Sequence, residues 1–277
     1  MFRDEFKESY TTIPFAIYRE NSPSGNLDLI SHRHKEIELI SMTEGEATFY
    51  IDSTPYKTEK GDIIIIPPYS IHRAHGETEK NISYNCICFN IELLWDEKIK
   101  NGFTQNALTV KSIIKKDDPY AKKLQECIED GCKACEDKNS GWEMEAIGNM
   151  SLIFGILKKN GYFISSVPSS PKKDFSEIVM KYISENYCSN ITSGLTAKEL
   201  FMNNSYFCRL FKTTFGCCFS DYILAYRLTR AKFNLINTTM SITDIAFANG
   251  FNNCSYFCKA FKARFGEPPL SYRKNHR

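Results

Sequence analysis

Three histidines and a glutamate in the first third of the chain have the types and spacing of a polar or metal-binding site. His32 and His34 are two residues apart, Glu38 has the same parity, and His72 follows two hairpins later. Residues of one parity on a β-strand point to one face, so one interior wall could present the first three. Neutral imidazoles and a carboxylate suit a divalent metal ion, and they also suit the hydroxyl groups of a small molecule.

A second feature of the sequence is a segment of 18 residues that occurs twice. Residues 205–222 and 255–272 are identical at nine of 18 aligned positions. In each copy phenylalanines recur every four residues, at 207, 211 and 215 and at 257, 261 and 265, which puts them on one helical face. Basic residues lie on another face. We therefore expect each copy to pack through its phenylalanines and to leave its basic face free.

Charge is divided unevenly along the chain. From residue 172 onward 15 Lys/Arg oppose 7 Asp/Glu, whereas the preceding residues hold 20 against 26. The basic part predicts a polyanionic partner, which by charge alone could be DNA, RNA or a membrane surface. Eleven cysteines and the lack of an apolar leader favour a reducing cytoplasm, and no apolar run is long enough for a membrane helix. Cys132 and Cys135 form a C-x-x-C in a helical segment and are expected to be buried thiols.

These residues require two kinds of scaffold. Residues 11–90 consist of short β-branched and aromatic segments separated by turn residues, which is typical of an all-β barrel or sandwich. From residue 117 the period becomes helical, and Ile147, Met150, Phe154 and Leu157 form a seam that covers the barrel or pairs with a second subunit. Proline and serine then predict a linker. We expect a barrel at 1–116, helices at 117–163, a linker at 164–173 and a helical domain at 174–277.

The helical domain predicts two helix-turn-helix modules. In the first, Thr196 begins a capping-box pattern with Glu199, and the next helix ends at Gly216. In the second, Ser241 begins a similar pattern before the turn at Gly250. Residues 219–236 contain no glycine or proline and predict a connecting helix of about 27 Å. Two recognition helices could then lie roughly one DNA turn apart.

The barrel resembles the cupin superfamily. Its first motif is met in full and its second in part, by His32, His34, Glu38 and Gly45 and by Gly61, Pro67 and His72. Tyr69 stands where the second motif has glycine, and Gly76 where it has asparagine. The resemblance implies a ligand pocket lined by the three histidines and Glu38. The departure favours a metal-free effector pocket, with a bound metal and purely structural histidines as the alternatives.

The second half resembles the DNA-binding domain of the AraC/XylS family of transcription regulators. The matching residues are Ile245-Ala246, Gly250-Phe251, Ser255-Tyr256-Phe257, Phe261-Lys262, Phe265-Gly266, Pro268 and Tyr272-Arg273. The resemblance implies promoter DNA as partner, contacted by Asn204, Ser205, Cys208, Arg209, Lys212, Asn253, Cys254, Ser255, Lys259, Lys262 and Arg264. Arg209 and Lys259 can donate to guanine, whereas Lys212, Lys262 and Arg264 are expected on phosphates.

The sequence therefore predicts a two-domain α+β chain, with an N-terminal cupin-like β-barrel plus helical hairpin and a C-terminal all-α tandem helix-turn-helix domain. Its expected function is sequence-specific transcription regulation in the cytoplasm by a homodimer that responds to a small molecule, with a sugar as the first candidate. An activator would also contact RNA polymerase. No cofactor and no enzymatic activity are expected. The alternative is a metal-dependent cupin enzyme that uses His32, His34, Glu38 and His72 and carries an accessory DNA-binding tail.

Overall fold

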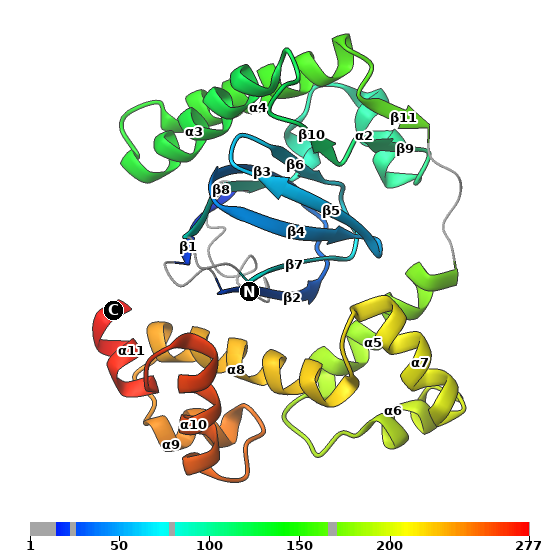
Figure 1. The fold of residues 1–277 in the computed structure, drawn as a ribbon, viewed down its shortest axis with the longest axis vertical. Helices are drawn as coiled ribbons and strands as arrows, with labels where there is room; N and C mark the ends of the chain where they lie inside the picture. Colours follow the sequence, from blue (N-terminus) through cyan, green and yellow to red (C-terminus); the bar gives the residue numbers. More distant parts are fainter. Residues whose placement is uncertain (1–14, 23–25, 78–80, 166–170, 277) are drawn as a thin grey trace. The chain divides into compact units, whose positions relative to one another are not determined.

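The computed structural model describes residues 15–22, 26–77, 81–165 and 171–276 (Figure 1). The chain divides near residue 170 into two compact units. The predicted linker begins within strand β11 (Phe163–Ser165) and ends within helix α5 (Pro171–Asn186), and its middle, 166–170, lies outside the described residues, as do residues 1–14 of the predicted barrel. Among the described residues, no helix has the length and apolar character needed to span a membrane.

Two antiparallel sheets form the N-terminal unit. The five-stranded sheet has the order β1-β8-β3-β6-β10 and the four-stranded sheet the order β2-β7-β4-β5. Their strands are β1 (Phe15–Ser22), β2 (Asn26–His32), β3 (Ile37–Glu44), β4 (Glu46–Ile51), β5 (Thr54–Glu59), β6 (Ile63–Ile66), β7 (His72–Glu77), β8 (Ile82–Phe89) and β10 (Ile113–Ile114). A separate pair joins β9 (Leu108–Val110) to β11.

The five-stranded sheet is buried on both faces. Ile40 and Ile64 belong to the core between the two sheets, whereas their neighbours Leu39 and Ile65 belong to the core on the outer face. This explains why β6 is a continuous run of isoleucines, since a strand covered on both sides needs no polar alternation. The inner face is the one that carries Glu38.

Helices cover the outer face of the five-stranded sheet (Figure 1). They are α3 (Ala121–Asp137) and α4 (Trp142–Lys159), and α2 (Glu97–Thr104) packs near β9. Met150, Phe154 and Leu157 of the predicted seam are buried in this core. The seam therefore packs on the barrel, and pairing with a second subunit stays a prediction.

The C-terminal unit is wholly helical, and the expected fold class is confirmed. Its helices are α5, α6 (Ser193–Glu199), α7 (Asn204–Phe215), α8 (Phe219–Asn237), α9 (Ile242–Ala248), α10 (Cys254–Phe265) and α11 (Pro269–His276). In Figure 1 the long helix α8 runs between α5–α7 on one side and α9–α11 on the other.

The phenylalanine stripe of the first module is buried as expected, and that of the second module is buried at Phe257 and Phe261 but only partly at Phe265. Phe207, Phe211 and Phe215 are at most 1% exposed, and Phe211 makes edge contacts with Phe219 and stacks on Phe215. Full burial of one such side chain contributes about 1.5–3 kcal/mol. These residues build the module and are not available for stacking on bases.

The start of the first module differs from the prediction. Helix α6 begins one turn earlier than Thr196, because the side chain of Thr192 accepts a hydrogen bond from Leu195 N and caps the helix. Thr196 is instead an interior residue of α6 with a fully buried side chain. The second module follows the expected pattern, since Ser241 Oγ accepts from Asp244 N at 3.0 Å.

Candidate functional site

The polar residues singled out in the barrel come together, but from both sheets. His32 ends β2 and pairs with His72 at the start of β7, in the four-stranded sheet. Glu38 lies on β3 of the five-stranded sheet, and His34 lies in the connection between β2 and β3. The expectation that one wall presents His32, His34 and Glu38 is therefore wrong, because the chain turns after His32 and crosses to the facing sheet.

The four side chains form a compact buried cluster. Their donor atoms all lie within 4.8 Å of one another. Glu38 Oε2 lies 3.2 Å from His34 Nε2 and 3.1 Å from His72 Nε2. The rings of His32 and His72 are 4.0 Å apart between centroids. His32, Glu38 and His72 are at most 1% exposed, so any charge that the cluster carries is shielded from water.

Backbone carbonyl groups hold the three imidazole rings in place. The Nδ1 atoms of His32, His34 and His72 lie 3.0, 3.1 and 2.9 Å from backbone carbonyl oxygens. These oxygens belong, in the same order, to Ile30, Glu36 and Ser70. The Nε2 atom of each ring is thereby left for other ligands, which is the arrangement that metal-binding histidines commonly show.

Two cysteines adjoin the cluster and were missed in the sequence. Cys86 and Cys88 lie two apart on β8, so both side chains belong to the core between the sheets. Cys86 Sγ donates to Glu38 Oε1 at 3.0 Å, and Cys88 Sγ lies 3.6 Å from Cys86 Sγ. Their parity was visible in the sequence. Their closeness to Glu38 was not, because it depends on the register that pairs Glu38 with Cys88.

A strained residue lies beside the cluster. Tyr69 has φ +61, and its amide donates to His34 O at 2.7 Å. The Arg33 guanidinium lies 5.7 Å from the centroid of the Tyr69 ring. The backbone thus keeps the left-handed conformation expected of the glycine in the second motif, while an aromatic side chain occupies the position. Such strain costs about 1–3 kcal/mol and is common at ligand sites.

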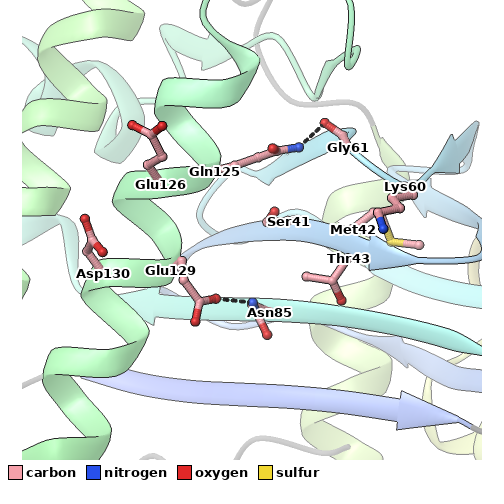
Figure 2. Close-up of a pocket in the computed structure, with 10 residues that line it drawn as sticks. All are labelled: Ser41, Met42, Thr43, Lys60, Gly61, Asn85, Gln125, Glu126, Glu129 and Asp130. Atoms are coloured by element: carbon pink, nitrogen blue, oxygen red, sulfur yellow. Dashed lines mark hydrogen bonds between the residues drawn. The ribbon is translucent and has the colours of Figure 1, made fainter.

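A second hollow lies on the outer face of the five-stranded sheet, beside α3 (Figure 2). Its volume is about 450 Å³, and it is lined by residues of β3, β8, α3 and the turn between β5 and β6. These are Ser41, Met42, Thr43, Lys60, Gly61, Asn85, Gln125, Glu126, Glu129 and Asp130. Glu129 accepts from Asn85 and pairs with Arg19 at 3.0 Å, so part of its acidic charge is already balanced. No sequence motif joins these residues.

The thiols of the C-x-x-C pattern are buried, as expected. Cys132 and Cys135 are at most 8% exposed. Burial raises the pKa of Cys132 to about 12 and that of Cys135 to about 11. Both thiols therefore stay protonated at neutral pH, which makes them poor metal ligands and poor nucleophiles.

The residues expected to contact DNA lie on the outward faces of α7 and α10. Nine of them are exposed: Asn204, Ser205, Cys208, Arg209, Lys212, Asn253, Ser255, Lys259 and Lys262. Cys254 and Arg264 are half-buried. Asparagines cap both helices, since Asn203 Oδ1 accepts from Ser205 N and Tyr206 N, and Asn253 Oδ1 accepts from Tyr256 N. The second helix of each module therefore begins with an asparagine cap, and its first turn is exposed in both modules.

The two modules are joined at a junction that the sequence analysis missed. Arg227 of α8 donates from Nε to Tyr187 O at 2.8 Å and from Nη2 to Ser189 O at 2.7 Å. Cys188 Sγ donates to Ala248 O at 3.0 Å. At Gly250, with φ +78, a Cβ would lie 2.8 Å from Tyr187 O. The segment after α5 thus packs directly on the turn of the second module.

The corresponding turn of the first module carries an unusual residue. Phe201 donates its amide to Lys198 O, as Gly250 does to Phe247 O, and it has φ +54. Its side chain is 99% exposed. A bulky residue in this backbone conformation is a genuine outlier, and no packing offsets its cost.

Two family models match the chain. An AraC-like ligand binding domain matches residues 24–148, and a helix-turn-helix domain matches residues 196–275. Together they span both units.

The chain is also similar over nearly its full length to known regulators. It is 22% identical to the uncharacterized HTH-type transcriptional regulator YdeC of Bacillus subtilis, over 95% of this chain and 92% of that protein. It is 22% identical to the melibiose operon regulatory protein of Escherichia coli K12, over 96% and 93%. Among solved structures, that of fatty acid-bound ToxT from Vibrio cholerae has a TM-score of 0.54 at 14% identity and covers 94% of this chain and 95% of that one. This last likeness concerns the fold alone.

Proposed function

The chain belongs to the AraC/XylS family of transcription regulators, and from that premise we propose which residues read DNA, what the barrel senses and how the chain assembles. It is a DNA-binding regulator with a ligand-binding domain. The observation that carries the proposal is the exposed basic face that occurs at the same place in both modules. A face repeated in this way suits two successive major-groove contacts on one duplex.

Arg209 and Lys259 are proposed to read base edges. They occupy equivalent positions on α7 and α10, and both are exposed. The Arg209 guanidinium lies 5.6 Å from the Tyr206 ring centroid, which restrains a flexible side chain near the start of the helix. Lys212, Lys262 and Arg264 follow about one turn later and are proposed to bind phosphates. The remaining contacts are proposed for Asn204, Ser205, Cys208, Asn253, Cys254 and Ser255.

Selection of duplexes from a random library with the full chain, followed by binding measurements, tests this assignment. Arg209→Ala should cost roughly 1–3 kcal/mol at one base pair and relax selectivity there, whereas Lys212→Ala should weaken all duplexes alike and reduce the salt dependence. Lys181→Ala, which removes an exposed charge from α5, is the matched control and should change little. Equal binding of all duplexes by the wild type would instead indicate a nonspecific architectural protein.

The effector is proposed to bind in the barrel at His32, His34, Glu38 and His72. A sugar is the first class to test, because one full-length relative is a melibiose operon regulatory protein and because imidazole and carboxylate groups suit hydroxyls. A ligand of the native state raises its apparent stability, so a sugar that binds there should raise the melting temperature of the full chain. The increase should be lost in Glu38→Gln. A shift of the same size in that variant would place the ligand elsewhere, and the hollow beside α3 would be examined next.

The functional unit is proposed to be a cytoplasmic homodimer without enzymatic activity, which contacts RNA polymerase if it activates. The outward face of α4 supports dimerisation, since Met144 and Leu152 are 77% and 45% exposed there, and no described residue lies within 4 Å of a Cβ placed on Gly148 or Gly155. Light scattering should show a dimer that Leu152→Glu converts to a monomer. A wild-type monomer at micromolar concentration would refute this assembly.

A further inference from the structure

The hollow beside α3 has a buried hydroxyl group in its floor (Figure 2). Ser41 follows Ile37 and Leu39 at the same parity on β3, and those two residues belong to the outer core, so the Ser41 side chain also faces α3. Ser41 is 5% exposed, and its hydroxyl has no hydrogen-bond partner in the part of the chain that the structure describes. Buried polar groups in proteins are normally paired. The partner of this hydroxyl must therefore come from the hollow itself.

Hydrogen bonds hold the walls of the hollow in place. Asn85 donates from Nδ2 to Glu129 Oε2 and accepts from Arg19 Nη1 at 2.9 Å. Both carboxylate oxygens of Glu129 accept from Arg19, at 3.0 and 3.1 Å. Gln125 donates to Gly61 O, whereas its Oε1 accepts from no described residue. The walls are thus fixed before a ligand enters, and they leave one amide oxygen available to it.

The lining carries one unpaired charge of each sign. Two of its three carboxylates have cationic partners, at 3.0 and 3.2 Å. Asp130 and Lys60 form no ion pair with any residue that the structure describes. They come from opposite sides of the hollow, Asp130 from α3 and Lys60 from the turn between β5 and β6 (Figure 2). A ligand with one positive and one negative group matches both, whereas a singly charged ligand leaves one of them unmatched.

We propose that the hollow is a second ligand site, which binds a small zwitterion, namely a free amino acid with a polar side chain. The ammonium group lies toward Asp130 and the carboxylate toward Lys60, which leaves the Ser41 hydroxyl and Gln125 Oε1 for the side chain. The volume of about 450 Å³ is within the range of about 300–1,000 Å³ that is common for small-molecule sites. The five-stranded sheet separates this site from the barrel cluster, because Glu38 lies on the inner face of the sheet and Ser41 on the outer face.

The test uses the full chain, with the twenty amino acids of proteins as probes in melting curves and in titration calorimetry. At least one polar amino acid should raise the melting temperature and bind at about one molecule per chain. Two analogues of that amino acid are then compared with it, an amine that lacks the carboxylate and an acid that lacks the amino group. Each should bind about 3–10-fold more weakly, because it loses one charged contact. Absence of binding by all twenty probes, or undiminished binding of either analogue, would overturn the proposal.

Substitutions in the lining locate the ligand. Asp130→Asn and Lys60→Gln should each weaken amino-acid binding by about 3–10-fold, and Ser41→Ala by about 2–10-fold through the loss of one hydrogen bond. The amine analogue should bind Lys60→Gln as it binds the wild type, because it lacks the group that Lys60 contacts. Asp137→Asn removes an exposed carboxylate at the end of α3, outside the hollow, and is the control that should change nothing. Wild-type affinity in either charge variant, or a further loss of the amine analogue in Lys60→Gln, would overturn the assignment. Circular dichroism of every variant verifies folding.

Amino-acid binding is measured without DNA, so its failure is distinguishable from failure of the proposed function. A sugar that binds in the barrel and the amino acid should bind together, because the sheet separates their sites. Displacement of one by the other would overturn the second site. A chain that binds its selected duplex specifically but binds no amino acid refutes this inference and leaves the proposed function intact. A chain that binds the amino acid but binds all duplexes alike supports the second site and refutes the proposed function.

Discussion

Replacing Gly250 by alanine tests whether the two helix-turn-helix modules are held together by close backbone contact. The backbone there has φ +78, and a Cβ would lie 2.8 and 2.9 Å from the carbonyl oxygens of Tyr187 and Cys188 and 3.0 Å from Arg227 Nε. Gly266 has a similar φ of +82, but nothing lies within 4 Å of its Cβ position. Comparison of the two variants therefore separates the cost of the backbone conformation from the cost of the contact.

The expected magnitudes follow from these two positions. A left-handed backbone costs an L-residue about 1–2 kcal/mol, and alanine regains roughly 0.4–1 kcal/mol by restricting the unfolded chain. Gly266→Ala should therefore lower the free energy of unfolding by up to about 1.6 kcal/mol. In Gly250→Ala two carbonyl groups must also move, one of them bonded to Arg227, and the loss should be roughly 2–4 kcal/mol.

The assay must report on the C-terminal unit alone. Both tryptophans, Trp95 and Trp142, lie in the N-terminal unit, so their fluorescence does not follow this change. Hydrogen exchange of the α8 and α10 amides, measured by mass spectrometry, gives the opening free energy of the affected helices. Binding of the selected duplex is measured alongside it, and Gly250→Ala should lose more affinity than Gly266→Ala. Equal losses in the two variants would refute the argument from close contact.

Three further predictions concern other features. Phe201→Gly should raise the stability of the first module by up to about 1.6 kcal/mol, measured by hydrogen exchange in α7. It relieves a left-handed backbone that costs about 1–2 kcal/mol, and the freer unfolded chain takes back roughly 0.4–1 kcal/mol. Arg19 also pairs with Glu136 at 2.5 Å. Arg19→Ala should cost at most about 1 kcal/mol in denaturant unfolding followed by tryptophan fluorescence at neutral pH, because Arg19 and its partners Glu129 and Glu136 are exposed. The hydrogen bond from Arg19 lowers the pKa of Glu136, so this deficit should persist above the unfolded-state pKa of about 4.3 and vanish as the pH falls below the folded-state value. Iodoacetamide at neutral pH should label the exposed Cys208 and spare Cys132, whose pKa burial raises to about 12, as judged by peptide mass spectrometry.

Each of these three predictions has an outcome that would contradict it. A lower stability of Phe201→Gly would mean that the phenyl ring makes contacts that outweigh the strain. A deficit in Arg19→Ala that grows on acidification would contradict the direction of the Glu136 shift. Labelling of Cys132 as fast as Cys208 in the native chain would show that the α3 core opens readily.

The helical half of the chain was largely predictable, because its signals are local. The phenylalanine spacing at 207, 211 and 215 defines the buried face of α7, and Gly216 ends the helix with φ +79. The predicted start of α6 was wrong for a physical reason. Thr192 and Thr196 are both able to cap a helix, and the choice between them was made by the burial of Thr196 in the packed module, which no local pattern shows.

The barrel site was predictable in its residues but not in its construction. Periodicity describes one strand at a time, so it could not show that His32 and Glu38 face each other across two sheets. The contact between Cys86 and Glu38 depends on strand register, and the Arg227 contacts depend on how α8 meets the segment after α5. Contacts between residues that lie far apart in the sequence produce no regular spacing, so no sequence pattern predicts them.

The junction at Arg227, Cys188 and Gly250 also constrains the DNA. Because α8 and this junction fix one module against the other, the two recognition helices cannot rotate separately around the duplex axis. B-DNA repeats about every 10.5 base pairs, so both helices meet a major groove only when their half-sites keep one helical phase. Insertion of about five base pairs turns one half-site to the opposite side of the duplex, where its module cannot follow. If both modules bind one duplex, as we propose, the distance between half-sites is part of what this protein recognises, alongside their sequence.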